Sequence, residues 1–221
     1  MHPTRVFILF AATLVVSCSG EPEQEIQPEV TKAPVPGVYN GTFPCDGCPG
    51  IPTSLWLQSD RRFFMRQSYP ANDEREALDA FSLGRWAWDA DEQRLVLRGA
   101  GPSRVFTRPD IDSLLMETGS PLEHRLKRDP AGPDFVSRLA MAGTIRVHDG
   151  SASFTECLTG IRVPIERSGD YRRFILQYRS KNPKGAPAYV ELEGRFNWTA
   201  DKTPKSLVIE RFISIRPDQS C

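Results

Sequence analysis

From Gly37 onward the chain is divided into short β-type runs separated by turn residues, and this division limits the folds open to it. The runs recur roughly every eight to twelve residues, which is typical of an antiparallel meander, sandwich or barrel. In the first half they lie at 38–43, 53–57, 62–69, 84–88, 94–97, 103–107 and 113–117. The 19 prolines and 16 glycines exceed what a helical bundle tolerates, so the sequence predicts an all-β protein.

The second half has a different order of elements. Its runs are strands at 139–147, 151–155 and 161–165, then a helix, then strands at 188–199 and 206–215. The helix is predicted from the i, i+3, i+4, i+7 spacing of Tyr171, Phe174, Ile175 and Tyr178, with Ser168 as its cap. Three strands, a helix and two strands is the order of a five-stranded OB barrel.

The N-terminus indicates export and lipidation. A short region with Arg5 precedes an apolar run at 6–16, which is too short to span a bilayer and is typical of a signal peptide. The run ends in Leu-Val-Val-Ser-Cys, which resembles the lipobox of bacterial lipoproteins, where the cysteine is acylated. We therefore expect Cys18 to become the lipid-bearing N-terminus that attaches the protein to a membrane, with Ser19, which is not aspartate, favouring the outer membrane.

These signals divide the chain into five segments. We expect a signal peptide at 1–17, the lipidated Cys18 with a flexible, proline-rich tether at 18–36, a β-domain at 37–127, a linker at 128–137 and an OB-fold domain at 138–221. An edge strand is an alternative for the part of the tether near 26–30.

Charge and motifs exclude several functions. With 28 Lys+Arg against 28 Asp+Glu, the chain lacks the basic excess that a phosphate backbone requires, so no nucleic-acid partner is expected. Gly-x-Ser-x-Gly, His-Glu-x-x-His and phosphate-loop motifs are missing from the sequence, and it has three histidines. We predict a protein that is not an enzyme and has no catalytic residues.

Cys45 and Cys48 form the motif in which the chemistry is concentrated. A Cys-x-x-Cys pair has three interpretations: a structural or labile disulfide in an oxidising compartment, a soft-metal site, or a redox site. The redox interpretation requires a helix starting at the first cysteine, and Pro-Gly-Ile-Pro at 49–52 would stop it. The expected export favours the disulfide, and two thiolates keep Cu(I) binding open, with Met65 or His124 contributing only if the fold brought them near.

Cys157 and Cys221 lie in the predicted OB domain. Four mature thiols allow three pairings, and segregation by domain favours Cys45–Cys48 with Cys157–Cys221. The second bond would close a loop of about 65 residues, worth ~4 kcal/mol by loop entropy. We therefore expect the OB domain to depend on oxidation for its stability.

Three stretches resemble one known family. They are 37–57, with Phe-Pro-Cys-Asp-Gly-Cys-Pro-Gly-Ile, then 152–164, with Glu-Cys-Leu-Thr-Gly, and 190–196, followed by the terminal Cys221. Together with Gly-Arg-Trp at 84–86 they resemble the NlpE (copper homeostasis, CutF-type) outer-membrane lipoproteins over nearly the whole mature chain. The chain departs from the family at Asp46-Gly47, where Ala and Asp or Ser are usual.

The resemblance implies an N-terminal lipocalin-like antiparallel half-barrel followed by a C-terminal OB-fold barrel. It also implies an envelope-stress or copper-related sensor, lipid-anchored in the outer membrane and facing the periplasm, that activates the Cpx inner-membrane sensor kinase. The alternative is a copper or small-ligand carrier that uses Cys45 and Cys48. No cofactor is required in either case, with copper as the ligand to test.

Overall fold

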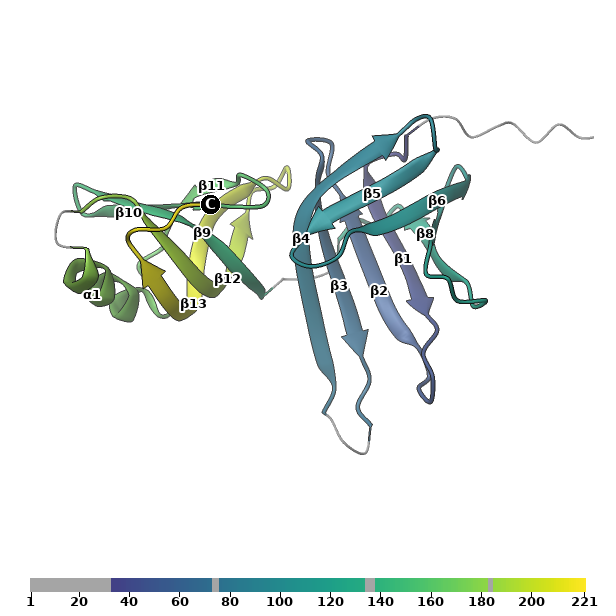
Figure 1. Ribbon diagram of the computed structural model, residues 1–221, viewed down its shortest axis with the longest axis horizontal. Helices are drawn as coiled ribbons and strands as arrows, with labels where there is room; N and C mark the ends of the chain where they lie inside the picture. The colour runs from purple at the N-terminus through teal and green to yellow at the C-terminus, as the bar shows by residue number, and fades with distance from the viewer. Residues whose placement is uncertain (1–32, 73–75, 134–137, 183–184) are drawn as a thin grey trace, which may run out of the picture.

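The computed structural model describes residues 33–72, 76–133, 138–182 and 185–221. These residues form two β-rich domains that lie side by side along the long axis of the molecule (Figure 1). The expected signal peptide, Cys18 and the tether up to residue 32 lie outside the described residues.

The first domain is a closed antiparallel barrel in the strand order β1 to β8. Its strands are β1 (Gly37–Phe43), β2 (Ile51–Leu57), β3 (Arg62–Tyr69), β4 (Leu78–Asp89), β5 (Arg94–Gly99), β6 (Arg104–Asp110), β7 (Ser113–Met116) and β8 (His124–Asp129). β1 closes the barrel because it pairs with β2 on one side and with β8 on the other: Asn40 lies opposite both Ser54 and Lys127.

Strand alternation fills the barrel. Phe63 and Met65 on β3 point inward with Leu55 and Leu57 on β2, and each is at most 1% exposed. The rest of this core is contributed by the other strands: Tyr39, Phe43, Trp86, Leu95, Leu97, Phe106, Leu114 and Leu126. The period of two expected of half-buried strands therefore places one side chain in two inside the barrel.

β8 is the strand that the sequence did not indicate. It reads His-Arg-Leu-Lys-Arg-Asp, and Leu126 is its one buried residue, so its charge density resembles that of a linker. Pairing with β1 and β7 satisfies its backbone groups and turns the expected half-barrel into a closed barrel.

The second domain confirms the expected OB fold. Its elements are β9 (Leu139–His148), β10 (Ser151–Glu156), β11 (Arg162–Pro164), α1 (Tyr171–Lys181), β12 (Ala188–Trp198) and β13 (Pro204–Arg216). The sheet order is β11-β10-β9-β12-β13, and a parallel bridge between Ile165 and Leu207 brings its two edges together.

The cap of α1 is Asp170 rather than the expected Ser168, and the Asp170 carboxylate accepts the Phe212 backbone N–H at 2.8 Å.

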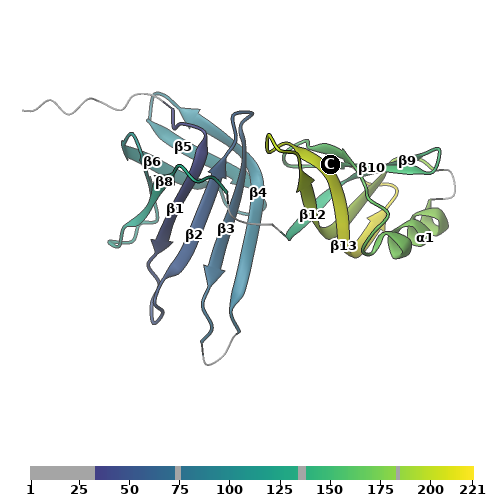
Figure 2. The same cartoon turned by 180° about the vertical axis from the view of Figure 1, so that it is seen from behind.

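The two ends of the OB barrel are covered by different elements. At one end α1 inserts Phe174 and Tyr178, which are 0% and 2% exposed, and Phe174 contacts Phe212 at 5.8 Å between ring centroids. The first barrel lies at the other end, with β4 nearest to the OB domain in both views (Figures 1 and 2). The OB core is thus continuous with the outer face of the first barrel.

A row of three side chains on that outer face makes the contact. Trp56, Phe64 and Leu83 are register partners across β2, β3 and β4. Phe64 lies 5.1 Å from the Trp198 ring and 6.5 Å from the Phe196 ring, and Trp56 lies 5.1 Å from Trp198. Phe64 is 1% exposed although it points out of its own barrel, because the OB domain covers it.

Two polar contacts flank the aromatic rings. The Gln58 Nε2 donates to the Lys202 carbonyl at 3.4 Å, which joins the β2–β3 turn to the β12–β13 turn. An Arg85 Nη2 on β4 donates to the Thr159 carbonyl at 2.7 Å, in the turn after β10. The interface therefore has an aromatic centre and a polar edge.

A disulfide between Cys157 and Cys221 ties the chain end to the turn after β10, with a Cα–Cα distance of 5.4 Å and a sequence separation of 64. The other disulfide, Cys45–Cys48, spans a separation of 3. Loop-closure entropy grows with the size of the closed loop, so the two bonds stabilise the chain unequally.

We predict that Trp198→Ala uncouples the domains. Each lost aromatic pair costs about 0.5–1.5 kcal/mol beyond buried area, and Trp198 contacts both Trp56 and Phe64. Differential scanning calorimetry should show one transition for the wild type and two for the variant. Tyr171→Ala, on the far side of the OB domain, should keep a single transition; a single transition in Trp198→Ala as well would contradict this account of the interface.

We predict that the double variant Cys157→Ser/Cys221→Ser loses ~4 kcal/mol of unfolding free energy, whereas Cys45→Ser/Cys48→Ser loses ~2 kcal/mol. Urea unfolding followed by circular dichroism measures both. Equal losses would show that loop closure does not set the contribution of these bonds.

Candidate functional site: the cysteine loop of the barrel

The loop between β1 and β2 carries the Cys45–Cys48 disulfide, with a Cα–Cα distance of 5.6 Å. Both cysteines are half-buried, while Asp46 and Gly47 between them are exposed. The Gly50 backbone N–H points at the Cys48 Sγ at 3.4 Å. The pair is therefore held at a surface turn and reachable from solvent.

Glycine is required where the loop returns to the barrel. Gly50 has a φ of 121°, and a Cβ there would lie 2.4 Å from the Thr42 Cγ2. Gly47 also has a positive φ, of 66°, but a Cβ there would meet no other group within 4 Å. The close approach of β1 and β2 thus needs Gly50, whereas Gly47 serves the turn between the cysteines.

A hollow of about 670 Å³ lies beside this loop. Thr42, Pro49 and Gly50 line it on the loop side, and Tyr69 and Leu78 line it from β3 and β4. Leu78 is 54% exposed. The disulfide is therefore next to a partly apolar surface at the end of the barrel.

Met65 and His124, the two candidate additional ligands, lie in different environments. Met65 is 1% exposed in the barrel core, where it packs with the other inward side chains. The His124 ring, on β8, lies 5.1 Å from the ring of Phe43, two residues before Cys45. The structure thus brings His124 to the base of the cysteine loop and keeps Met65 away from solvent.

The local structure bears on the redox and metal interpretations. Residues 44–50 form an irregular loop with a turn and β2 begins at Ile51, so the helix that the redox interpretation requires does not start at Cys45. Among the described residues, three or more His, Cys, Asp or Glu side chains nowhere gather in the geometry of a metal site.

A second notable site surrounds Cys157, and sequence reasoning missed it. Glu156 is 1% exposed, and its Oε2 accepts the Thr159 backbone N–H at 2.6 Å and the Thr159 hydroxyl at 2.5 Å. Arg85 reaches the carbonyl of the same Thr159. The sequence pattern could have shown this burial. Side chains alternate along β10, so Glu156 lies on the same inward face as Ala152 and Phe154.

The described end of the expected tether contacts the barrel. The Tyr39 hydroxyl donates to the Val35 carbonyl at 2.7 Å, and the Arg108 Nη1 donates to the Ala33 carbonyl at 3.2 Å. Burial raises the pKa of Tyr39, with Arg108 and Arg128 opposing that rise. Residues 33–36, which the sequence assigned to the tether, are therefore attached to the folded domain.

Within the described ranges, no helix has the length and apolar character that crossing a membrane would need; α1 has 11 residues.

Comparison with known proteins identifies relatives of both domains. Residues 39–122 match the family model of the NlpE N-terminal domain, and residues 136–221 match that of the NlpE C-terminal OB domain. The chain is 28% identical over 197 residues to the lipoprotein NlpE of Escherichia coli K12, covering 85% of this chain and 81% of that protein.

Solved structures give two further similarities. The crystal structure of the Cpx pathway activator NlpE from Escherichia coli is 25% identical, covers 85% of this chain and 98% of its own, and has a TM-score of 0.34. A 1.42 Å structure of a Shewanella oneidensis protein is 28% identical and covers 43% of this chain and 89% of its own, with a TM-score of 0.35. The two family models together span most of the sequence, and the chain therefore belongs to the NlpE family.

Proposed function

We propose that this protein is a non-catalytic signalling lipoprotein of the cell envelope, anchored through Cys18 in the outer membrane and facing the periplasm. The observation that carries the proposal is the match of both domains to the NlpE family. The relative from Escherichia coli is described as a lipoprotein and as an activator of the Cpx pathway, and neither description names an enzyme.

In this proposal a sensor kinase responds to where the protein is located and to whether it is folded. Correctly sorted protein stays at the outer membrane, whereas mis-sorted or misfolded protein lingers at the inner membrane, where it reaches a sensor kinase. The expected lipobox and the Ser19 next to it support the sorting part of the argument.

The two disulfides supply the folding part. Cys157–Cys221 closes the large loop of the OB domain, and its Cys157 lies between Glu156 and the turn that Arg85 holds. Failure to form this bond would loosen the OB domain and the contact with the first barrel together. Oxidation of the envelope is thereby linked to the state of both domains.

We predict that Ser19→Asp, which directs a lipoprotein of this kind toward retention at the inner membrane, raises an envelope-stress reporter several-fold. The reason is that more protein then reaches the kinase. Cys18→Ser, which removes the acylation site, is the control and should leave the reporter near its baseline. A silent reporter in cells that hold lipidated protein at the inner membrane would refute the proposal.

A second candidate function, a Cu(I) carrier, is favoured by the half-buried position of Cys45 and Cys48 together in a surface turn. Reduction of the surface disulfide would release two thiolates, which are the soft donors that Cu(I) prefers. Cys45 and Cys48 therefore fit Cu(I) as a two-thiolate pair once they are reduced.

We predict that the reduced protein binds Cu(I) in equimolar amount and that Cys45→Ser and Cys48→Ser each abolish stoichiometric binding. His124→Ala should leave the affinity unchanged because the described residues gather no third ligand at the pair, and Met65→Leu should also leave it unchanged because Met65 is buried in the barrel. Competition with a chromogenic Cu(I) chelator measures all four variants. If the cysteine variants bind as the wild type does, the carrier function is excluded.

A further inference from the structure

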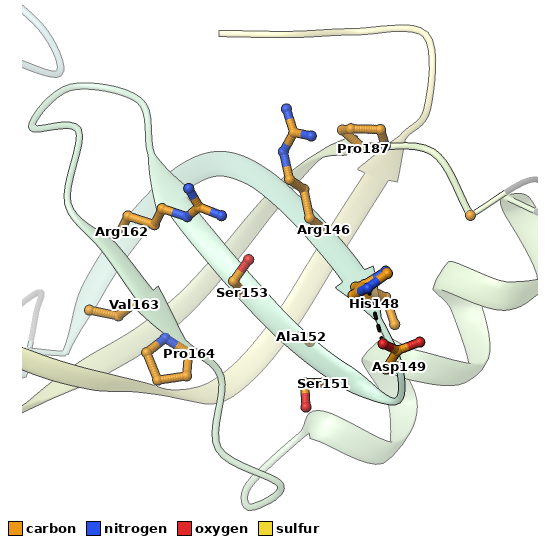
Figure 3. A pocket seen from close by; sticks show the side chains of 12 residues that line it. Arg146, His148, Asp149, Ser151, Ala152, Ser153, Arg162, Val163, Pro164 and Pro187 are labelled. Carbon is orange, nitrogen blue, oxygen red and sulfur yellow. Dashed lines mark ion pairs between the residues drawn. The ribbon is translucent and has the colours of Figure 1, made fainter.

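A hollow of about 900 Å³ opens on the outer face of β9, β10 and β11, beside the β9–β10 turn. Arg146, Ser153 and Pro164 form one register row across the three strands, and all three line the hollow. Pro187, which follows α1 in the chain, borders it on the β9 side (Figure 3). The surface is open and crosses several strands, so it suits an extended ligand better than a compact one.

Two arginines project from this surface. Figure 3 shows Arg146 and Arg162 on the same side of the sheet, with the Ser153 hydroxyl between them. Both arginines are exposed, and within the described part of the chain neither guanidinium has a hydrogen bond or an ion pair. Their donors are therefore available to a ligand.

The arginines toward the other edge of the OB sheet are paired with carboxylates. On β12 and β13, Arg195, Arg211 and Arg216 each pair with a glutamate, and Arg138 before β9 pairs with two. The glutamates are Glu191, Glu193 and Glu210. Among the described residues, the arginines on β12 and β13 are therefore neutralised by glutamates, whereas Arg146 on β9 and Arg162 on β11 are not.

The surroundings of the hollow preserve this positive charge. Asp149 is its one acidic lining residue among those described, and its carboxylate faces the adjacent imidazole, with the His148 Nε2 at 3.0 Å. Another guanidinium borders the same turn, because the Arg167 Nη2 donates to the Gly150 carbonyl at 2.8 Å.

The chemistry of the ligand follows from these groups. Guanidinium groups bind carboxylates and phosphates through paired N–H donors, and serine hydroxyls bind sugar hydroxyls. In OB folds the face of the second and third strands, here β10 and β11, with the loop between the first two, binds oligosaccharides and oligonucleotides. The expected export signal would carry the protein away from cytoplasmic nucleic acid. Of these two ligand classes, we therefore favour the oligosaccharide.

We propose that Arg146, Arg162 and Ser153 form a binding site for an anionic oligosaccharide, whose carboxylate or phosphate groups contact the two guanidiniums. This site goes beyond the signalling role proposed above, and neither depends on the other. It would give the OB domain a contact with charged glycan of the envelope on the outer face of β9, β10 and β11.

Isothermal titration of the full-length protein in non-ionic detergent tests the site. Trigalacturonate supplies carboxylates, with maltotriose as its neutral match; trehalose 6-phosphate supplies a phosphate, with trehalose as its match. We expect at least one anionic probe to bind with a dissociation constant below about 1 mM and its neutral match to bind at least tenfold more weakly, since a hydrogen bond to a charged group contributes about 1.5–3 kcal/mol. Binding of one anionic probe alone identifies carboxylate or phosphate as the group recognised.

Variants locate the site. Arg146→Gln and Arg162→Gln should each weaken binding about tenfold while the melting temperature stays unchanged, because both side chains are exposed. Arg172→Gln, an exposed arginine on α1 outside the hollow, is the matched control and should bind as the wild type does. The proposal is overturned if neither anionic probe binds, if neutral and anionic probes bind equally, if Arg172→Gln weakens binding as much as Arg146→Gln, or if hexathymidylate binds more tightly than the glycans.

Discussion

The alternation of side chains along β3 organises the whole molecule. Phe63 and Met65 point into the first barrel, whereas Phe64 between them points out and enters the core of the OB domain. One strand therefore contributes to both hydrophobic cores, and a shift of its register by one residue would exchange the two sets. The contacts of Phe64 with Trp198 and Phe196 make the outer face of the barrel the closure of one end of the OB domain. Docking of the domains is thus part of OB packing rather than an addition to it.

The Arg85 contact places the Cys157–Cys221 disulfide next to this interface. Glu156 is buried beside Cys157, its carboxylate holds the Thr159 turn, and Arg85 from the first barrel donates to that turn. A buried carboxylate is costly to keep without partners, so the two hydrogen bonds that Glu156 Oε2 accepts from Thr159 stabilise this turn. The disulfide, the turn and the domain contact therefore form a continuous structure, which suits a protein whose proposed signal is its own folding state.

Much of the fold and of the cysteine chemistry could be predicted from local pattern. Strands β1 to β7, the order of the OB elements and α1 follow from period-two and period-3.6 spacing and from turn residues. β8 could not be found in this way, because Leu126 is its one buried residue and its charges face solvent. Its existence depends on pairing with β1, whose partner residues lie 87 to 91 positions away in sequence (Asn40 with Lys127, Val38 with Asp129), and such non-local pairing leaves no periodic signal. The role of Trp56 and Trp198 could not be predicted for the same reason. In the sequence they are aromatic residues of two separate strands, and their contact forms only across the domain interface.

The sequence by itself determined the all-β class, the two domains, the family and the presence of a cysteine loop, because each depends on residue types at short spacing. The tertiary structure decided what those residues face. It placed His124 at the base of the cysteine loop and enclosed Met65, although both stood equal as candidates in the sequence. Among the described residues it also left Arg146 and Arg162 without a hydrogen bond or ion pair, while Arg195, Arg211 and Arg216 on β12 and β13 pair with glutamates. Charge balance over the chain is zero, but only the fold decides where opposite charges meet.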